Sequence, residues 1–130
     1  MKAVCTALAA SALCAAVFGC ASVKRLGDFR GVKVEGGAEP VGVVDVYNTN
    51  WFLFSVLPIV SGDTDNPGGW TTKFFRNTAT VENQLKMLEA EAKRAGASRA
   101  VNVATFTTDE SVLLFLFLRE KYHTMAVLIK

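Results

Sequence analysis

The sequence predicts an α+β domain in which an antiparallel β-sheet packs against one helix. One segment, at about residues 79–95, shows helical periodicity with recognisable start and stop signals. Runs of β-branched and aromatic residues lie on both sides of it, and the turns between them are too short for parallel crossovers. The chain has 130 residues, of which 51% are hydrophobic and 20% charged, as is typical of a single folded domain.

The helix is the most clearly marked element. Thr78 or Thr80 can cap its start, Glu82 lies in its first turn, and Gly96 supplies a stop. Its apolar side chains recur at helical spacing and predict a narrow buried stripe of Val81, Leu85, Leu88, Ala92 and Ala95.

An N-terminal hairpin is expected before the helix. Residues 41–47 and 51–60 are rich in β-formers and flank Asn48-Thr49-Asn50. Asparagine tolerates the left-handed conformations that tight turns require, so the turn is predicted at these three residues. The polar, glycine-rich stretch after the hairpin, at 61–77, predicts a long loop.

A three-stranded meander is expected after the helix. Its predicted strands are residues 100–107, 112–118 and 122–129, separated by polar turns at 108–110 and 119–121. The middle strand, 112–118, has the sequence VLLFLFL and would be buried from solvent on both faces. The helix covers one face, and the second needs other cover: the loop, the first hairpin, a second protomer, a lipid surface or a bound acyl ligand.

The first 19 residues have the layout of a secretory signal. Lys2 supplies a positive start, residues 3–18 are apolar and uncharged, and small residues follow. The alanine-rich run is shorter than the roughly 20 strongly apolar residues that a membrane-spanning helix needs.

The residues Val17-Phe18-Gly19-Cys20 resemble the lipobox of bacterial lipoproteins, although Phe18 is bulkier than the usual residue there. The resemblance implies cleavage between Gly19 and Cys20, a diacylglyceryl group on the Cys20 thiol and acylation of the new N-terminus. Cys5 and Cys14 would be removed with the signal, which leaves the mature chain no thiol for a disulfide.

Three segments are therefore expected. Residues 1–19 form the signal peptide, residues 20–38 the lipidated cysteine and a flexible tether, and residues 39–130 the folded domain. Ala21 stands where an aspartate would favour inner-membrane retention, so the resemblance implies the outer membrane, facing the periplasm.

The candidate chemical motifs favour conformational roles. His123 is the single histidine, and a zinc site would need further imidazole or thiolate ligands, which the mature chain lacks. The stretch 63–69, DTDNPGG, resembles the start of a 12-residue calcium loop. Pro67 and Phe74 stand at its fifth and twelfth positions, where calcium needs oxygen ligands, so no metal is expected. Turn residues such as Ser111 need no catalytic explanation, and no phosphate-binding glycine loop is present in the sequence.

The sequence thus predicts a membrane-anchored, non-enzymatic interaction, sensing or scaffolding module of the bacterial envelope, without cofactors. A net charge of +2 and the lack of a basic stripe argue against nucleic acid. The expected partners are the lipid membrane, through acylated Cys20, and a second copy or an envelope protein. The alternative is a binder of a small hydrophobic or lipidic ligand between the sheet and the 61–77 loop. The candidate ligand or interface residues are Trp51, Trp70, Phe74 and Phe75.

Overall fold

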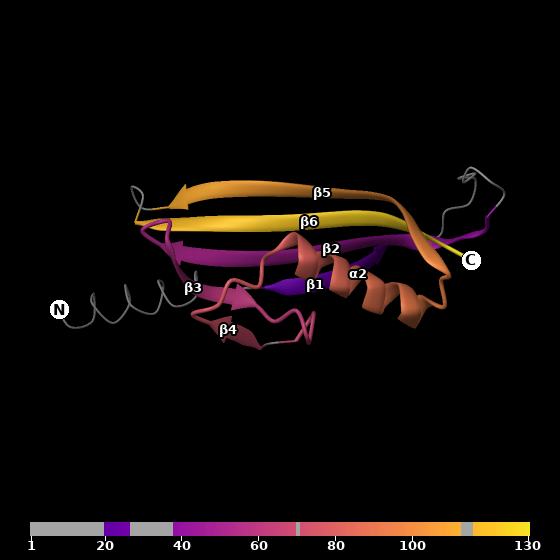
Figure 1. Ribbon diagram of the computed structural model, residues 1–130, viewed down its shortest axis with the longest axis horizontal. Helices are drawn as coiled ribbons and strands as arrows, with labels where there is room; N and C mark the ends of the chain where they lie inside the picture. The colour runs from indigo at the N-terminus through magenta and orange to yellow at the C-terminus, as the bar shows by residue number, and fades with distance from the viewer. Residues whose placement is uncertain (1–19, 27–37, 70, 113–115) are drawn as a thin grey trace, which may run out of the picture.

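The computed structural model describes residues 20–26, 38–69, 71–112 and 116–130. It shows an antiparallel sheet and one long helix, which confirms the α+β class (Figure 1). In chain order the described elements are β1 (Ala21–Leu26), β2 (Pro40–Leu53), β3 (Leu57–Gly62), β4 (Thr72–Phe74), α2 (Val81–Ala95), β5 (Arg99–Val112) and β6 (Phe117–Ile129).

The strands form one six-stranded sheet built around β2. The order is β4-β3-β2-β6-β5, and β1 also pairs with β2. β6 follows the whole length of β2 on one edge. On the other edge, β1 pairs with residues 43–48 and β3 with residues 50–53, so these two short strands succeed one another along β2.

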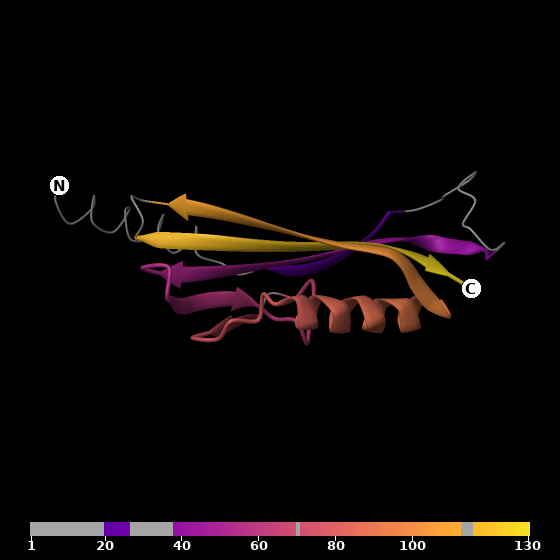
Figure 2. The same cartoon turned by 45° about the horizontal axis from the view of Figure 1, so that its top comes forward.

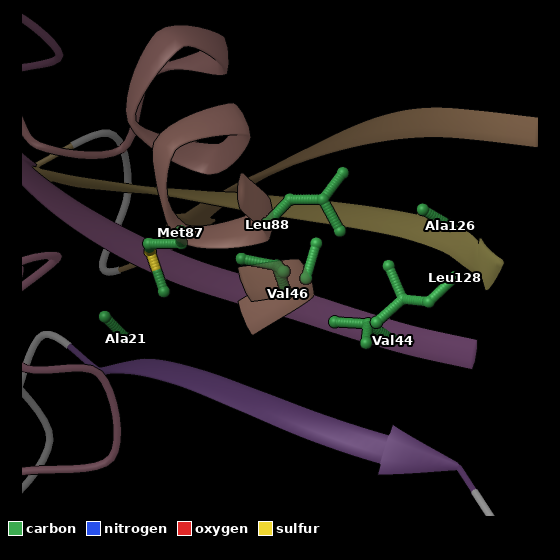
Figure 3. Packing of buried hydrophobic residues seen from close by; sticks show 8 residues of the cluster. Ala21, Val44, Val46, Met87, Leu88, Ala126 and Leu128 are labelled. Atoms are coloured by element: carbon green, nitrogen blue, oxygen red, sulfur yellow. The ribbon is translucent and has the colours of Figure 1, made fainter. Parts of the chain in front are cut away.

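The core lies between α2 and one face of the sheet (Figures 2 and 3). The buried apolar residues of this core cluster come from α2, from the middle of β2, from the end of β6 and from the first residue of β1. They are Ala21, Val44, Val46, Met87, Leu88, Ala92, Ala126 and Leu128.

The helix runs over Val81–Ala95 with the predicted caps. The hydroxyl of Thr80 accepts a hydrogen bond from the Asn83 backbone N–H at 3.3 Å. Gly96 takes φ 69° and closes the helix through the carbonyls of the last turn.

The buried stripe of the helix is rotated from the predicted one. Leu88 and Ala92 are buried as expected, but Val81 and Leu85 are about half exposed. Gln84 takes their place, because its side-chain amide meets backbone groups of β2. In the amide orientation that satisfies both atoms, its nitrogen donates to the Val46 carbonyl at 3.1 Å and its oxygen accepts from the Asn48 N–H at 3.3 Å.

The N-terminal hairpin exists, but its predicted turn at 48–50 is wrong. Those residues lie inside β2, where they pair with β6. The chain reverses at Phe54 and Ser55, which take φ 51° and 59°, and the Val56 N–H donates to the Leu53 carbonyl at 3.2 Å. The register pairs Leu53 with Leu57, so the loop holds three residues, and two of them take the positive φ values that tight hairpin turns require.

The three-stranded meander is also wrong, because β5 and β6 form one long hairpin. Both predicted turns lie inside strands, and the register sets them opposite each other, with Glu110 facing Arg119. Glu110 forms ion pairs with Arg119 and Lys121, so polar residues typical of turns stabilise a strand pair here. The predicted middle strand joins the two long strands instead: Val112 ends β5 and Phe117 begins β6, while 113–115 lie outside the described residues.

The predicted tether is wrong for residues 21–26, which form β1. β3 stops at Gly62 and leaves the rest of that β2 edge free, and β1 pairs there from Ala21 opposite Asn48 to Leu26 opposite Val43. The rest of the predicted tether, at 27–37, lies outside the described residues.

Candidate functional site

Cys20 is exposed and lies directly before β1. Its carbonyl accepts the Thr49 N–H at 3.0 Å, and the next residue, Ala21, is buried in the core. Gly62 allows this close packing, because a Cβ there would lie 2.3 Å from the Ala21 nitrogen. The backbone at Cys20 is therefore held against the sheet.

The Cys20 side chain lines a groove on the sheet face opposite α2. We call this the open face, because no helix of the described residues covers it (Figure 2). Along it, the Tyr47 and His123 rings lie 4.5 Å apart between centroids, and His123 Nδ1 lies 3.6 Å from Asp45 Oδ1. The groove has a volume of about 390 Å³ and is lined by Cys20, Ser22, Lys24, Asp45, Tyr47 and His123.

The register of the strands sets how far the two candidate nucleophiles lie from His123. Cys20, directly before β1, and His123, in β6, lie on opposite sides of β2, so their backbones are roughly 10 Å apart at ordinary strand spacing, although both residues line the groove. Ser111 pairs with Leu118, whereas His123 pairs with Phe106, five residues or roughly 16 Å further along β5. In the described ranges, no cluster of three or more histidine, cysteine or acidic side chains has a geometry that would hold a metal ion.

A charged row crosses the open face beyond the groove, and we define it as Glu110, Arg119 and Lys121. Glu110 bonds to both cations, with Lys121 Nζ 2.5 Å from its Oε1. The hydrogen bonds from Lys121 and then Arg119 hold the pKa of Glu110 below its usual value. The Arg119 guanidinium lies 5.3 Å from the centre of the Trp51 ring, a cation–π contact.

Beyond the charged row, the sheet ends in four exposed apolar side chains. We call Phe54, Val56, Leu57 and Leu116 the apolar tip; they are 65%, 80%, 51% and 38% exposed. The Phe54 N–H donates to the Leu116 carbonyl at 2.8 Å. This hydrogen bond joins the β2–β3 turn to the residue directly before β6. Figure 1 shows that β5 ends and β6 begins at the end of the sheet where β2 reverses into β3.

Of the four residues predicted to hold a ligand, the three that the structure describes differ in exposure. Trp51 is buried beneath Arg119, whereas Phe74 and Phe75 on the edge of the sheet are 62% and 70% exposed. The register places Val60 between Trp51 and Phe74. Trp70 lies outside the described residues.

The apolar tip was missed by sequence reasoning because its turn carries no turn signature. Asparagine and glycine mark such turns, yet Phe54 and Ser55 occupy the two left-handed positions. The usable signal was the stretch 51–57, which is apolar except for Ser55 and continues through the reversal between β2 and β3.

A second apolar surface lies between α2 and β5. Leu85 and Val103 border a groove of about 360 Å³ there and are about half exposed. β5 is the last strand of the sheet order, and no strand of the described residues pairs with its outer edge.

Comparisons with protein-family models, with curated proteins and with solved structures gave no match. Within the part of the chain that the structure describes, no helix is both long enough and apolar enough to cross a bilayer.

Proposed function

We propose that this chain is a lipoprotein of the bacterial envelope, held at the periplasmic side of the outer membrane by acylated Cys20, and that its folded part is a non-enzymatic interaction or scaffolding module. The observation that carries the proposal is the motif Val17-Phe18-Gly19-Cys20 after an uncharged apolar segment, with Cys20 exposed directly before the first strand.

The location of Cys20 suits a lipid anchor. An acylated side chain has to point away from the core, and Cys20 is exposed while its neighbour Ala21 is buried. One acyl chain gives only marginal membrane binding, whereas the two or more chains of a bacterial lipoprotein give stable anchoring.

Two surfaces support an interaction role for the folded part. The apolar groove between α2 and β5 offers a place for apolar side chains of a partner. The outer edge of β5, which is unpaired among the described strands, offers backbone groups for strand addition.

The test is expression of the full chain in a bacterium that exports lipoproteins, followed by detergent extraction and intact mass measurement. We expect a mass that lacks residues 1–19 and carries a diacylglyceryl group and an N-linked acyl chain. Cys20→Ser should leave an unprocessed chain without lipid, and Cys14→Ser, in the same N-terminal segment, should change nothing. A Cys20→Ser chain that is still processed and lipidated would contradict the proposal.

A further inference from the structure

The apolar tip contributes little to the packing of the domain. Its four side chains are 38–80% exposed, and none belongs to the core cluster between α2 and the sheet. Phe54 also takes φ 51°, a conformation that is unfavourable for a bulky side chain. A strained, exposed aromatic residue at a turn has no explanation in the fold of an isolated chain.

The position of Cys20 relates the tip to a lipid surface. Cys20 is bonded opposite Thr49, and Phe54 lies five residues further along the chain, directly after the end of β2, a span of roughly 16 Å. The lipid headgroup layer on each side of a bilayer is only about 5–8 Å deep. An anchor at Cys20 without a tether therefore holds the tip within reach of the acyl chains whenever the strands point toward the membrane.

The side chains along the strands change character in the order that a membrane interface requires. The tip carries no charge, and the charged row of Glu110, Arg119 and Lys121 lies behind it, near the level of Cys20. Long cationic side chains such as those of Arg119 and Lys121 are favoured at the headgroup level, and apolar side chains below it.

We propose that the apolar tip inserts into the acyl boundary of the same membrane that holds Cys20, so that the domain is attached at two points and stands in a fixed orientation. This inference rests on the lipid anchor proposed above. Because the tip is uncharged, the insertion depends on apolar burial and not on anionic lipids.

The experiment places an environment-sensitive fluorophore on the full, processed chain. Val56→Cys puts one thiol in the tip. Val41→Cys puts a matched thiol at an exposed valine, the second residue of β2, at the opposite end of the sheet. Each labelled protein is reconstituted into vesicles of phosphatidylcholine, with and without phosphatidylglycerol, in which part of the lipid carries a quencher on its acyl chain. Intact mass of each sample reports the acylation of Cys20 and the number of labels.

With Cys20 acylated, we expect the label at position 56 to shift to the blue and to lose about half or more of its emission to the acyl-chain quencher, since interfacial segments bury about 5–10 Å deep. The label at position 41 should stay unquenched, and both lipid mixtures should give the same result. Adding Phe54→Ser to the Val56→Cys chain should shift the equilibrium of the tip toward water by about tenfold.

Two results would overturn the inference separately from the anchor. An acylated chain whose label at position 56 is no more quenched than that at position 41 would leave the anchor in place and reject insertion. Quenching between labelled copies in place of lipid quenching would assign the tip to a second copy of the chain. An unacylated Cys20 would reject the anchor, and the inference would fail with it.

Discussion

Ser55 occupies a left-handed position that glycine would adopt without strain. Its φ of 59° is unfavourable for a side chain with a Cβ, and the residue is exposed, so it gains little from packing. We expect Ser55→Gly to raise the free energy of unfolding by about 1 kcal/mol, measured by urea denaturation. Ser111→Gly, at an exposed position inside β5, should lower it by about 0.5–1 kcal/mol. The same sign for both substitutions would contradict the assigned turn.

Glu120 makes the domain sensitive to pH. Burial first, and the facing Asp109 second, raise its pKa above the ordinary value of about 4.3. The charged form is therefore unfavourable in the folded state above the raised pKa, and this cost disappears as the pH falls through that pKa to the unfolded value.

Glu120→Gln should accordingly raise the free energy of unfolding at neutral pH by about 0.5 kcal/mol, a small value because solvent screens the pair. The gain should vanish below about pH 4, and urea denaturation at both pH values measures it. Glu89→Gln is the control: Glu89 pairs with Lys93, which lowers its pKa, so removing its charge should reduce stability at neutral pH.

Among the elements, α2 depends on its caps. Thr80 satisfies one of the backbone donors that the first helical turn leaves without partners. Thr80→Ala should lower the free energy of unfolding by about 1 kcal/mol, whereas Thr80→Ser keeps the hydroxyl and should recover most of it. Equal losses for the two variants in urea denaturation would show that the methyl group, and not the cap, is what matters.

β1 depends on the small size of Gly62. A Cβ at this position would lie 2.3 Å from the Ala21 nitrogen and 2.5 Å from the Cys20 carbonyl carbon, which are backbone atoms that cannot rotate away. Gly62→Ala should lower the free energy of unfolding by about 1–3 kcal/mol and expose β1 to proteolysis. Gly42→Ala meets no atom within 4 Å and should be close to neutral, so that equal effects in limited proteolysis would reject the close approach.

The helix was predictable from the sequence because its signals are local. The bounds of the strands were not, because they depend on which strands pair with each other. A threonine cap, a 3.6-residue period and a stop glycine lie within 20 residues, and the structure places α2 within two residues of the expected bounds. The polar stretches 108–110 and 119–121 favour turns locally, but their ion pairs across the β5–β6 hairpin outweigh that preference. Which residues of β2 the chain places opposite Cys20 is a long-range result that no local pattern contains.

The same limit applies to the candidate site. Cys20 was recognisable because a processing motif is written in consecutive residues. The apolar tip was not, because it forms only when the β2–β3 turn and Leu116 meet across the sheet. Trp51 was expected beside a ligand, but the cross-strand position of Arg119 covers its ring.

At the scale of the whole molecule, one end of the sheet holds the core and the other end is exposed. The core cluster lies where α2 covers the sheet, toward the end of β6, and the apolar tip lies at the opposite end (Figures 1 and 2). Stability should therefore be concentrated at the covered end, while the tip end is free to change without loss of fold.

A pair of matched leucines tests this division. Leu128 is 1% exposed within the core cluster, and Leu57 is 51% exposed in the apolar tip. Leu128→Ala should lower the free energy of unfolding by about 2–5 kcal/mol, because it removes buried methyl groups and leaves a cavity. Leu57→Ala should change it by less than about 0.5 kcal/mol, as for other exposed substitutions. Urea denaturation of both variants measures the difference, and a large loss for Leu57→Ala would mean that the tip packs against the fold and is not available to a membrane.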